Sequence, residues 1–345
     1  MTRLKDIAER AGVSVMTVSK ALRDAPDVSA TTKARIKALA QQLGYVPDST
    51  AQGLRNRTTK LFGVAVPSCA DPFIARVVLA IEERASELGY DLLLAQTLNI
   101  PEREEVCIHR FLARRVDGIF LAPVYRLGSE ARIYSELEAR RVPTVILGHP
   151  APFCSHFVCL EGDDHAGGAA VTSHLLKLGH TRIAFLAGPG VAPWARLRLE
   201  GCKKVLREHG LDLDDRLVFP AGRTIEDGAK VAAQMFNEAP DVTAVQAVND
   251  LVAIGFAQQC LAQGIQIPRD LSLAGYGNLP YGEHLLVPLT TVRQPKYRVG
   301  AAAVAAMHQI LQSLPVDHRA IQAELIVRGS TGPAPAGSPF HPAKA

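Results

Sequence analysis

The chain has 345 residues, of which 48% are hydrophobic and 21% are charged, and its formal net charge is +4. This length predicts two to three domains, and the composition is that of an ordinary globular protein with material for a sizeable core. Disordered, collagen-like and coiled-coil chains are therefore excluded.

The charge is distributed unevenly along the chain. Residues 1–60 carry 11 Lys or Arg against 5 Asp or Glu, whereas the rest carries 27 basic and 29 acidic residues. A basic head on a slightly acidic body is expected where one segment meets a polyanion, although a solvated basic face would look the same. No window approaches the roughly 20 apolar residues of a membrane span, and residues 1–6 lack the apolar core of an export signal. We therefore expect a soluble cytoplasmic protein.

The amino-terminal segment predicts three short helices. Apolar residues recur at helical spacing over residues 4–11, and Gly12 can end this helix because glycine tolerates positive φ. A second helix over 15–22 can be capped by Ser14. A third is expected from about Ser29, as its cap, to Leu43, where Gly44 ends it. The first two helices and their short turn match the helix-turn-helix unit, whose second helix lies in a DNA major groove. The same apolar spacing would also suit any small helical bundle.

Residues 48–60 read as a linker. They are polar and basic with few apolar anchors, and Gly53 lowers the stability of a helix there by about 1 kcal/mol relative to alanine. The segment is therefore expected to become helical only on binding.

From Leu61 onward, short apolar runs alternate with amphipathic stretches. This alternation predicts βαβ units, and so parallel sheets covered by helices. The expected strands form two series, LFGVAV, DLLLAQ, GIFLAP and PTVILG, then, after FVCLEGDD, RIAFLAG, LVFP, TAVQAV and LSLAGYG. Helices are expected near 74–88, 102–115, 129–141, 164–178, 195–209, 225–238 and 250–263.

The last part of the chain predicts a strand at TTVRQ, a long helix over about 296–314, a strand at IQAELIV and a disordered tail at 329–345. The six cysteines are scattered through apolar stretches, with no C-x-x-C and no histidine at zinc-finger spacing. We expect buried free thiols, although a redox role for Cys154 or Cys159 stays open.

Six motifs follow one another within residues 3–328: LKDIAERAGVS-x-x-TVSKAL, AQGL, LLKLGHTRIAFLAGP, ARLRLEGCKKVL, AVNDLVAIG and PLTTVRQP. Together they resemble bacterial transcriptional regulators of the LacI/GalR family. The resemblance implies an α-helical helix-turn-helix head (1–47), a hinge helix (48–60) and an effector-binding and dimerisation core (61–328). That core is α/β, with two doubly wound lobes like those of periplasmic sugar-binding proteins.

In this family the chain crosses between the lobes of the core three times. Lobe one would therefore hold residues 61–160 and 290–317, and lobe two residues 161–289 and 318–328. The family also works as homodimers, each subunit placing one head on half of a near-palindromic operator in double-stranded DNA.

The resemblance assigns base reading to Val15, Met16 and Lys20. Lys20 would donate to guanine O6 or N7, and the two apolar side chains would contact a thymine methyl. Leu54 would wedge into the minor groove at the operator centre, with Arg55 beside it reading the groove. Phosphate contacts, with helix capping as the alternative for each hydroxyl, are expected from Arg3, Ser14, Thr17, Ser19 and Thr32.

Small ligands of two-lobed α/β cores bind between the lobes, near the carboxyl ends of strands. Arg198 and Asp250 match the family's ligand-binding Arg and Asp. A guanidinium and an opposed carboxylate can hydrogen-bond the hydroxyl groups of a sugar. The alternative is that the two residues form an ion pair with a structural role only. Phe73 and Trp194 are candidate stacking surfaces for a sugar or base, or core residues. The other polar candidates are Ser68, Arg223, Asn249 and Gln294.

The expected cleft departs from the sugar-binding members of the family. Ala122 and Gly148 stand where those members place polar residues, and Gly277 and Asn278 replace an acidic pair. Arg223 stands where a lactose-responsive member has tryptophan. These departures favour a larger or more acidic effector, such as a sugar acid or a phosphorylated sugar.

The leading interpretation is a DNA-binding repressor controlled by a small effector, which the resemblance implies is a carbohydrate. The sign of the response is left open. A sugar receptor for transport would fit the core but not the basic head. An enzyme is disfavoured because no G-x-S-x-G elbow, P-loop or G-x-G-x-x-G after a strand occurs. His149, His156 and His165 lack metal spacing and are expected to be ordinary residues, so neither a cofactor nor a metal is expected.

Overall fold

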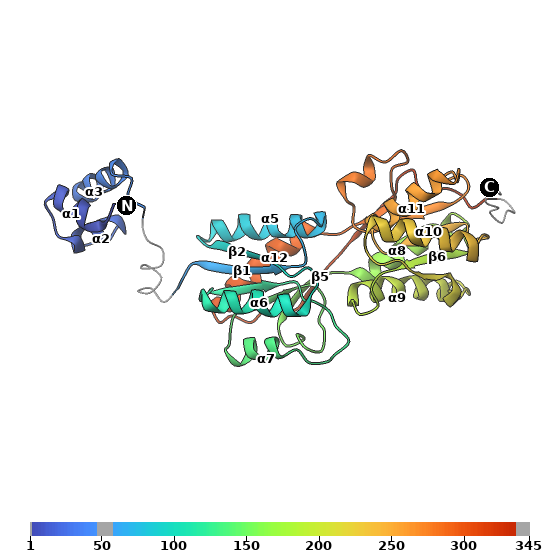
Figure 1. The fold of residues 1–345 in the computed structure, drawn as a ribbon, viewed down its shortest axis with the longest axis horizontal. Coiled ribbons are helices and arrows are strands. Elements are labelled where there is room, and N and C mark those ends of the chain that lie inside the picture. The colour runs from blue at the N-terminus through green and yellow to red at the C-terminus, as the bar shows by residue number, and fades with distance from the viewer. Residues whose placement is uncertain (1, 47–57, 336–345) are drawn as a thin grey trace. The chain divides into compact units, whose positions relative to one another are not determined.

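The computed structural model describes residues 2–46 and 58–335 (Figure 1). The chain divides into two compact units between Thr59 and Lys60. Leu54 and Arg55, with most of the predicted hinge at 48–60, lie outside the described residues. Within the described parts, no helix is long and apolar enough to cross a membrane.

The first unit contains the three predicted helices, α1 (Leu4–Ala11), α2 (Val15–Leu22) and α3 (Ala30–Gln42). Gly12 ends α1 with a φ of 63°, a left-handed conformation that costs glycine nothing. The predicted caps are also in place, because the Ser14 and Ser29 hydroxyls accept hydrogen bonds from backbone N–H groups of α2 and α3. The helices enclose a small buried core of Ile7, Ala8, Val18, Ala21, Ile36 and Ala40.

The second unit contains two lobes, and the first is built on a parallel six-stranded sheet in the order β11-β5-β4-β3-β1-β2. Its strands are β1 (Leu61–Val66), β2 (Asp91–Gln96), β3 (Gly118–Leu121), β4 (Thr144–Leu147), β5 (Val158–Gly162) and β11 (Arg319–Ile321). Helices cover both faces of this sheet (Figure 1), and the apolar side chains of both faces are buried beneath them. One face is covered by α5 (Pro72–Glu87) and α12 (Lys296–Leu311), the other by α6 (Pro101–Ala113) and α7 (Arg132–Ala139).

The second lobe has a parallel four-stranded sheet in the order β7-β6-β8-β9. Its strands are β6 (Ile183–Ala187), β7 (Val218–Pro220), β8 (Ala244–Ala247) and β9 (Ser272–Ala274). Helices α8 (Asp164–Lys177) and α9 (Pro193–Glu208) cover one face, and α10 (Ile225–Glu238) and α11 (Asp250–Ala262) cover the other (Figure 1). The expected doubly wound lobes are thus confirmed.

The crossings between the lobes lie later in the chain than expected. Strand β10 (Thr291–Arg293) pairs with β12 (Glu324–Ile326) beside the second-lobe sheet, although residue 290 was the expected return to lobe one. Strand β11 pairs with β5, so the chain is still in the first lobe at Ile321, past the expected boundary at 317. The strand predicted at IQAELIV (321–327) is therefore shorter than expected: β12 lies within it, whereas its first residue, Ile321, ends β11 in the other lobe.

The expectation of a disordered tail from residue 329 is wrong for residues 329–335. Ser330 is buried, and its carbonyl accepts a hydrogen bond of 2.8 Å from Leu273 N in β9. The Gly332 carbonyl accepts from the buried His180 ring at 2.9 Å, and Ala334 N donates to Leu178 O at 2.9 Å. These contacts cover the edge of β9, so backbone bonding holds a segment whose apolar content is low.

Candidate functional sites

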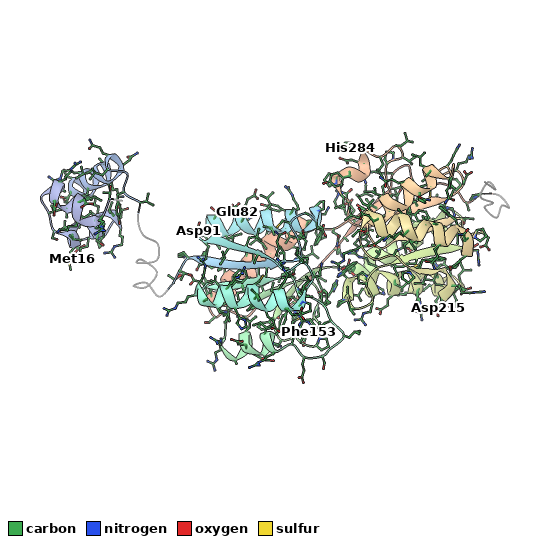
Figure 2. The ribbon with its side chains drawn as sticks, viewed as in Figure 1. Met16, Glu82, Asp91, Phe153, Asp215 and His284 are labelled. Atoms are coloured by element: carbon green, nitrogen blue, oxygen red, sulfur yellow. The ribbon has the colours of Figure 1, made fainter. Side chains whose placement is uncertain are left out.

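The outer face of α2 carries two exposed apolar side chains. Val15 is 43% exposed and Met16 is 68% exposed, and Figure 2 shows Met16 at the surface of the first unit. Large apolar side chains next to one another on a small unit indicate a contact surface rather than part of its core. Two of the three predicted base-reading residues are therefore available to a partner.

The hydroxyl groups expected to contact phosphates also serve as helix caps. Ser14 Oγ accepts a hydrogen bond of 3.1 Å from Thr17 N and lies 2.9 Å from Thr17 Oγ1. Thr32 Oγ1 lies 2.8 Å from Ser29 Oγ, the cap of α3. A phosphate would thus meet an N-terminal turn with polar groups already aligned along it.

The remaining predicted contacts of the head lie on its surface. Arg3 is exposed, and its backbone N–H donates to Asp6 Oδ2 at 2.7 Å. Ser19 accepts a hydrogen bond of 2.9 Å from Arg23 Nε through its carbonyl oxygen. Lys20 Nζ forms an ion pair with Asp27 Oδ2, in the loop between α2 and α3. No sequence pattern predicted a role for Asp27, because it lies seven residues from its partner and outside any helix.

The second unit contains a cavity of about 420 Å³ that is lined by residues of both lobes. It lies where the strands β1, β4, β8 and β9 end, as expected for a ligand site of two-lobed α/β proteins. All eight residues predicted to bind an effector lie on its wall: Ser68, Phe73, Trp194, Arg198, Arg223, Asn249, Asp250 and Gln294.

Arg198 is buried at the base of this cavity. Its Nε and Nη2 atoms each lie 2.7 Å from Asp164 Oδ1, and Nη1 donates to Val248 O at 2.7 Å. The guanidinium carbon also lies 3.6 Å from the ring centre of Tyr276, a cation–π contact. Arg198 is therefore held in a fixed position on the cavity wall.

Close packing of α8 on α9 brings Arg198 to Asp164. A Cβ atom on Gly168 of α8 would lie 2.3 Å from Arg198 O, and one on Gly201 of α9 would lie 2.2 Å from His165 O. Both positions therefore require glycine, because any side chain would push the helix backbones apart. The pairing of Arg198 with Asp164 follows from this helix contact.

Asp250 is fully buried and is not the partner of Arg198 in the described structure. Its Oδ1 accepts a hydrogen bond of 2.6 Å from Thr291 Oγ1, and its Oδ2 accepts one of 2.7 Å from Leu279 N. Burial raises the pKa of Asp250, and these hydrogen bonds oppose that change. The structural ion pair between Arg198 and Asp250, considered from the sequence, is therefore absent among the described contacts.

His149 is a cavity residue that the sequence analysis treated as ordinary. Its Nε2 lies 2.6 Å from Asp164 Oδ2 and its Nδ1 lies 2.6 Å from Glu161 Oε2, so the ring lies between two carboxylates. Burial opposes the charged ring, but the two carboxylates outweigh burial and raise the pKa of His149 to about 9. His149 comes from the first lobe and Asp164 from the second, so their contact joins the lobes.

Asp164 connects the two cations. Burial favours its neutral form, but Arg198 and His149 keep its pKa below the usual value. No motif marked this residue, although it lies in the first turn of α8, where the helix dipole favours a carboxylate.

The aromatic side chains of the cavity are only partly available for stacking. The Trp194 ring centre lies 4.9 Å from the Arg198 guanidinium carbon and 5.8 Å from that of Arg223. Trp194 also packs against the apolar core of the second lobe. Phe73 is half-buried in the first turn of α5 and packs against the core of the first lobe.

Several polar groups on the cavity wall have hydrogen-bond donors or acceptors that are not used within the described residues. The Arg223 guanidinium and the Gln294 side-chain amide form no hydrogen bond or ion pair within the described residues. Ser68 Oγ accepts from Ala70 N at 3.1 Å, and its own proton has no acceptor in the described part of the chain. Asn249 caps α11 and donates to Arg223 O at 3.0 Å. Burial lowers the pKa of Arg223, an effect that Asp71 and Asp227 oppose.

Comparison with known proteins gives matches over nearly the whole chain. Residues 3–48 match the family of bacterial regulatory proteins described as the lacI family, and residues 172–331 match the periplasmic binding protein-like domain. The HTH-type transcriptional repressor CytR of Escherichia coli K12 is 30% identical over 331 residues, which cover 95% of this chain and 96% of CytR.

The ribose operon repressor of Escherichia coli K12 is also 30% identical, over 90% of this chain and 94% of that protein. Among solved structures, the Lac repressor dimer bound to operator and the anti-inducer ONPF superposes with a TM-score of 0.86. It is 29% identical and covers 96% of this chain and 99% of the repressor chain.

Proposed function

Because this chain belongs to the lacI family of bacterial regulatory proteins, and is thus a DNA-binding transcriptional regulator, we propose that it is a repressor controlled by a small effector. The effector binds in the cavity between the lobes of the second unit. The observation that carries this proposal is the cavity wall, to which the first lobe contributes His149 and the second lobe Arg198 and Asp164. The named relatives are repressors, which supports a regulatory rather than an enzymatic role.

The contacts between the lobes supply a means of control. His149 of the first lobe and Asp164 of the second are joined across the cavity at 2.6 Å, so a ligand that alters this contact alters the angle between the lobes. A ligand shifts such an equilibrium by the difference between its affinities for the two arrangements. In a homodimer, that angle sets the spacing of the two heads on a near-palindromic operator. Residues 48–60 act as the hinge between head and core in this proposal.

The effector is a carbohydrate that carries an acidic group, such as a sugar acid or a phosphorylated sugar. Arg198 and His149 are already neutralised by carboxylates, whereas Arg223 keeps its donors for a ligand. A forked guanidinium suits a carboxylate or phosphate, with which it forms paired charge-assisted hydrogen bonds. Gln294 and Ser68 are placed to bind hydroxyl groups, and Phe73 offers an apolar surface to the sugar ring.

Titration of the full-length protein tests the effector class. Trp194 is the single tryptophan of the chain and lies on the cavity wall, so its fluorescence reports directly on this site. Sugar acids and sugar phosphates should give saturable changes at lower concentrations than the matching neutral sugars. Saturable binding by neutral sugars alone would remove the acidic group from the proposal.

Selection of bound sequences from random duplexes of about 30 base pairs tests the operator. We expect a two-fold symmetric consensus, because each subunit of a dimer reads one half-site. Binding that is weak, salt-sensitive and without a consensus would contradict a head that reads sequence.

A further inference from the structure

Lys20, the basic residue of α2, forms an ion pair within the head itself. Lys20 Nζ contacts Asp27 Oδ2, and the two side chains are 38% and 53% exposed. Exposed ion pairs add little to stability, because water solvates both charges well. The pair is therefore poorly explained as a means of holding the head together.

The loop that carries Asp27 is fixed to both neighbouring helices. Ala25 N donates to Lys20 O of α2 at 3.1 Å, and Lys33 Nζ of α3 donates to Asp24 O at 3.1 Å. Val28 packs against the apolar core of the head. The Asp27 carboxylate therefore has a defined position relative to α2, and Lys20 is tethered to a fixed point.

Such a tether changes what a lysine can do at a DNA surface. A free ammonium on a four-carbon chain can reach many phosphates, and phosphate contacts carry no sequence information. The tethered ammonium keeps two of its three donors, which matches the adjacent O6 and N7 acceptors of guanine. The carboxylate beside it also repels phosphates, so contacts with arbitrary DNA are weakened.

We propose that Asp27 is a specificity-determining residue, which holds Lys20 away from phosphates and directs its remaining donors to a base edge. The proposal rests on the proposed function, a head that reads operator sequence, with Lys20 as the base-reading residue that the family resemblance assigns. It assigns to Asp27 a part in selecting the operator through Lys20.

The test compares Asp27→Asn with Asp24→Asn in the full-length protein. Asp24 lies in the same loop and pairs with Lys37 of α3 at 2.7 Å, so its substitution removes the same charge without touching Lys20. Asp24 has a φ of 57°, which asparagine adopts readily. Affinities are measured over a range of salt for the selected operator and for a scrambled duplex of equal length. Circular dichroism checks that each variant is folded, and Asp27→Ala serves as a second variant.

Asp27→Asn should bind the scrambled duplex more tightly and lower the ratio of specific to non-specific affinity about tenfold. Asp24→Asn should leave that ratio within about twofold. In a Lys20→Ala background, Asp27→Asn should no longer change the ratio.

Equal changes in the two aspartate variants would overturn the proposal, because total charge would then explain the effect. An undiminished effect of Asp27→Asn in the Lys20→Ala background would also overturn it, since Asp27 would then act without Lys20. If the unsubstituted protein does not discriminate between the duplexes, base reading itself fails, and the proposal for Asp27 fails with it. If the unsubstituted protein does discriminate while Asp27→Asn has no effect, only the role of Asp27 is lost.

Discussion

The head and the core cavity hold their charges in opposite ways. Lys20 and Asp27 of the head pair with 38% and 53% of their side chains exposed, whereas Arg198 and Asp164 of the cavity are 6% and 4% exposed. Exposed pairs contribute at most about 1 kcal/mol, but removing one partner of a buried pair costs about 3–5 kcal/mol. The head pair thus adds little to the stability of the head, while the cavity pair is a fixed frame around which a ligand must fit.

The largest expected effect comes from breaking the buried frame. Asp164→Asn leaves Arg198 and His149 facing a neutral amide in a buried site, so we expect the core to lose about 3–5 kcal/mol of unfolding free energy. Urea denaturation measures this loss. The matched control is Asp241→Asn in the same lobe. Asp241 pairs with Arg182, and both side chains are 43% exposed, so this variant should lose less than about 1 kcal/mol of unfolding free energy. Similar losses in the two variants would contradict the distinction between buried and exposed pairs.

The pH dependence of the core should reveal the same frame. The folded pKa of His149 is about 9 and its usual value is 6.5, so the folded state holds the proton more tightly than the unfolded state. The stabilisation is complete below about pH 6.5 and is lost as the pH rises through 9. It amounts to at most about 3 kcal/mol. The urea concentration at the unfolding midpoint should therefore decrease as the pH is raised from 7 to 9.5, and His149→Gln should make this decrease smaller. An equally steep decline in that variant would assign it to other groups.

Effector binding offers a more selective perturbation of the cavity. Arg223→Gln removes the guanidinium that we propose binds the acidic group of the effector. The affinity for acidic sugars should therefore fall by about 10- to 100-fold, or about 1.5–3 kcal/mol. The affinity for neutral sugars should change little. Arg216→Gln, in the same lobe with a side chain that is 89% exposed, is the control for loss of one positive charge. Trp194 fluorescence measures the affinities of both variants. Equal losses of affinity for acidic and neutral sugars in Arg223→Gln would count against a charge-specific role of Arg223.

The smallest expected effect lies in the head, where single exposed hydrogen bonds contribute little. Ser14→Ala removes the cap of α2 and should destabilise the head by about 1 kcal/mol, because Thr17 N loses its acceptor. Hydrogen exchange of head amides in the full-length protein measures this change. Ser19→Ala, on the same helix but without a capping role, should have a smaller effect. A larger effect of Ser19→Ala would show that the cap is not what stabilises this turn.

Much of the fold could be predicted because its signals are local. The Gly12 stop and the Ser14 and Ser29 caps act within one helical turn, so they fixed the ends of the head helices to within a residue or two. The alternation of apolar runs and amphipathic stretches likewise predicted most strands and helices of the core. The family resemblance, together with positions after predicted strands, also selected Arg198, Arg223 and the other polar residues that line the cavity.

The predictions failed where distant segments meet. One strand was predicted at IQAELIV, but only β12 lies within it, and β11 ends at its first residue. Strand β11 pairs with β5 and β12 pairs with β10, more than 30 residues earlier in each case. Residues 329–335 have little apolar content, yet backbone hydrogen bonds to β9 hold them in place. Neither outcome depends on properties of the segment alone.

The sequence by itself determined the helix-turn-helix head, the two-lobed α/β core, and which residues could carry charge at the ends of strands. Only the tertiary structure decided which charges meet: Asp164 with Arg198 and His149, and Asp27 with Lys20. The physical reason is that caps and hydrophobic periodicity act over three to seven residues, whereas a charge takes its partner from whatever the packing places within about 4 Å. In the cavity that packing depends on the crossing of the chain between lobes and on the glycine contacts of α8 with α9.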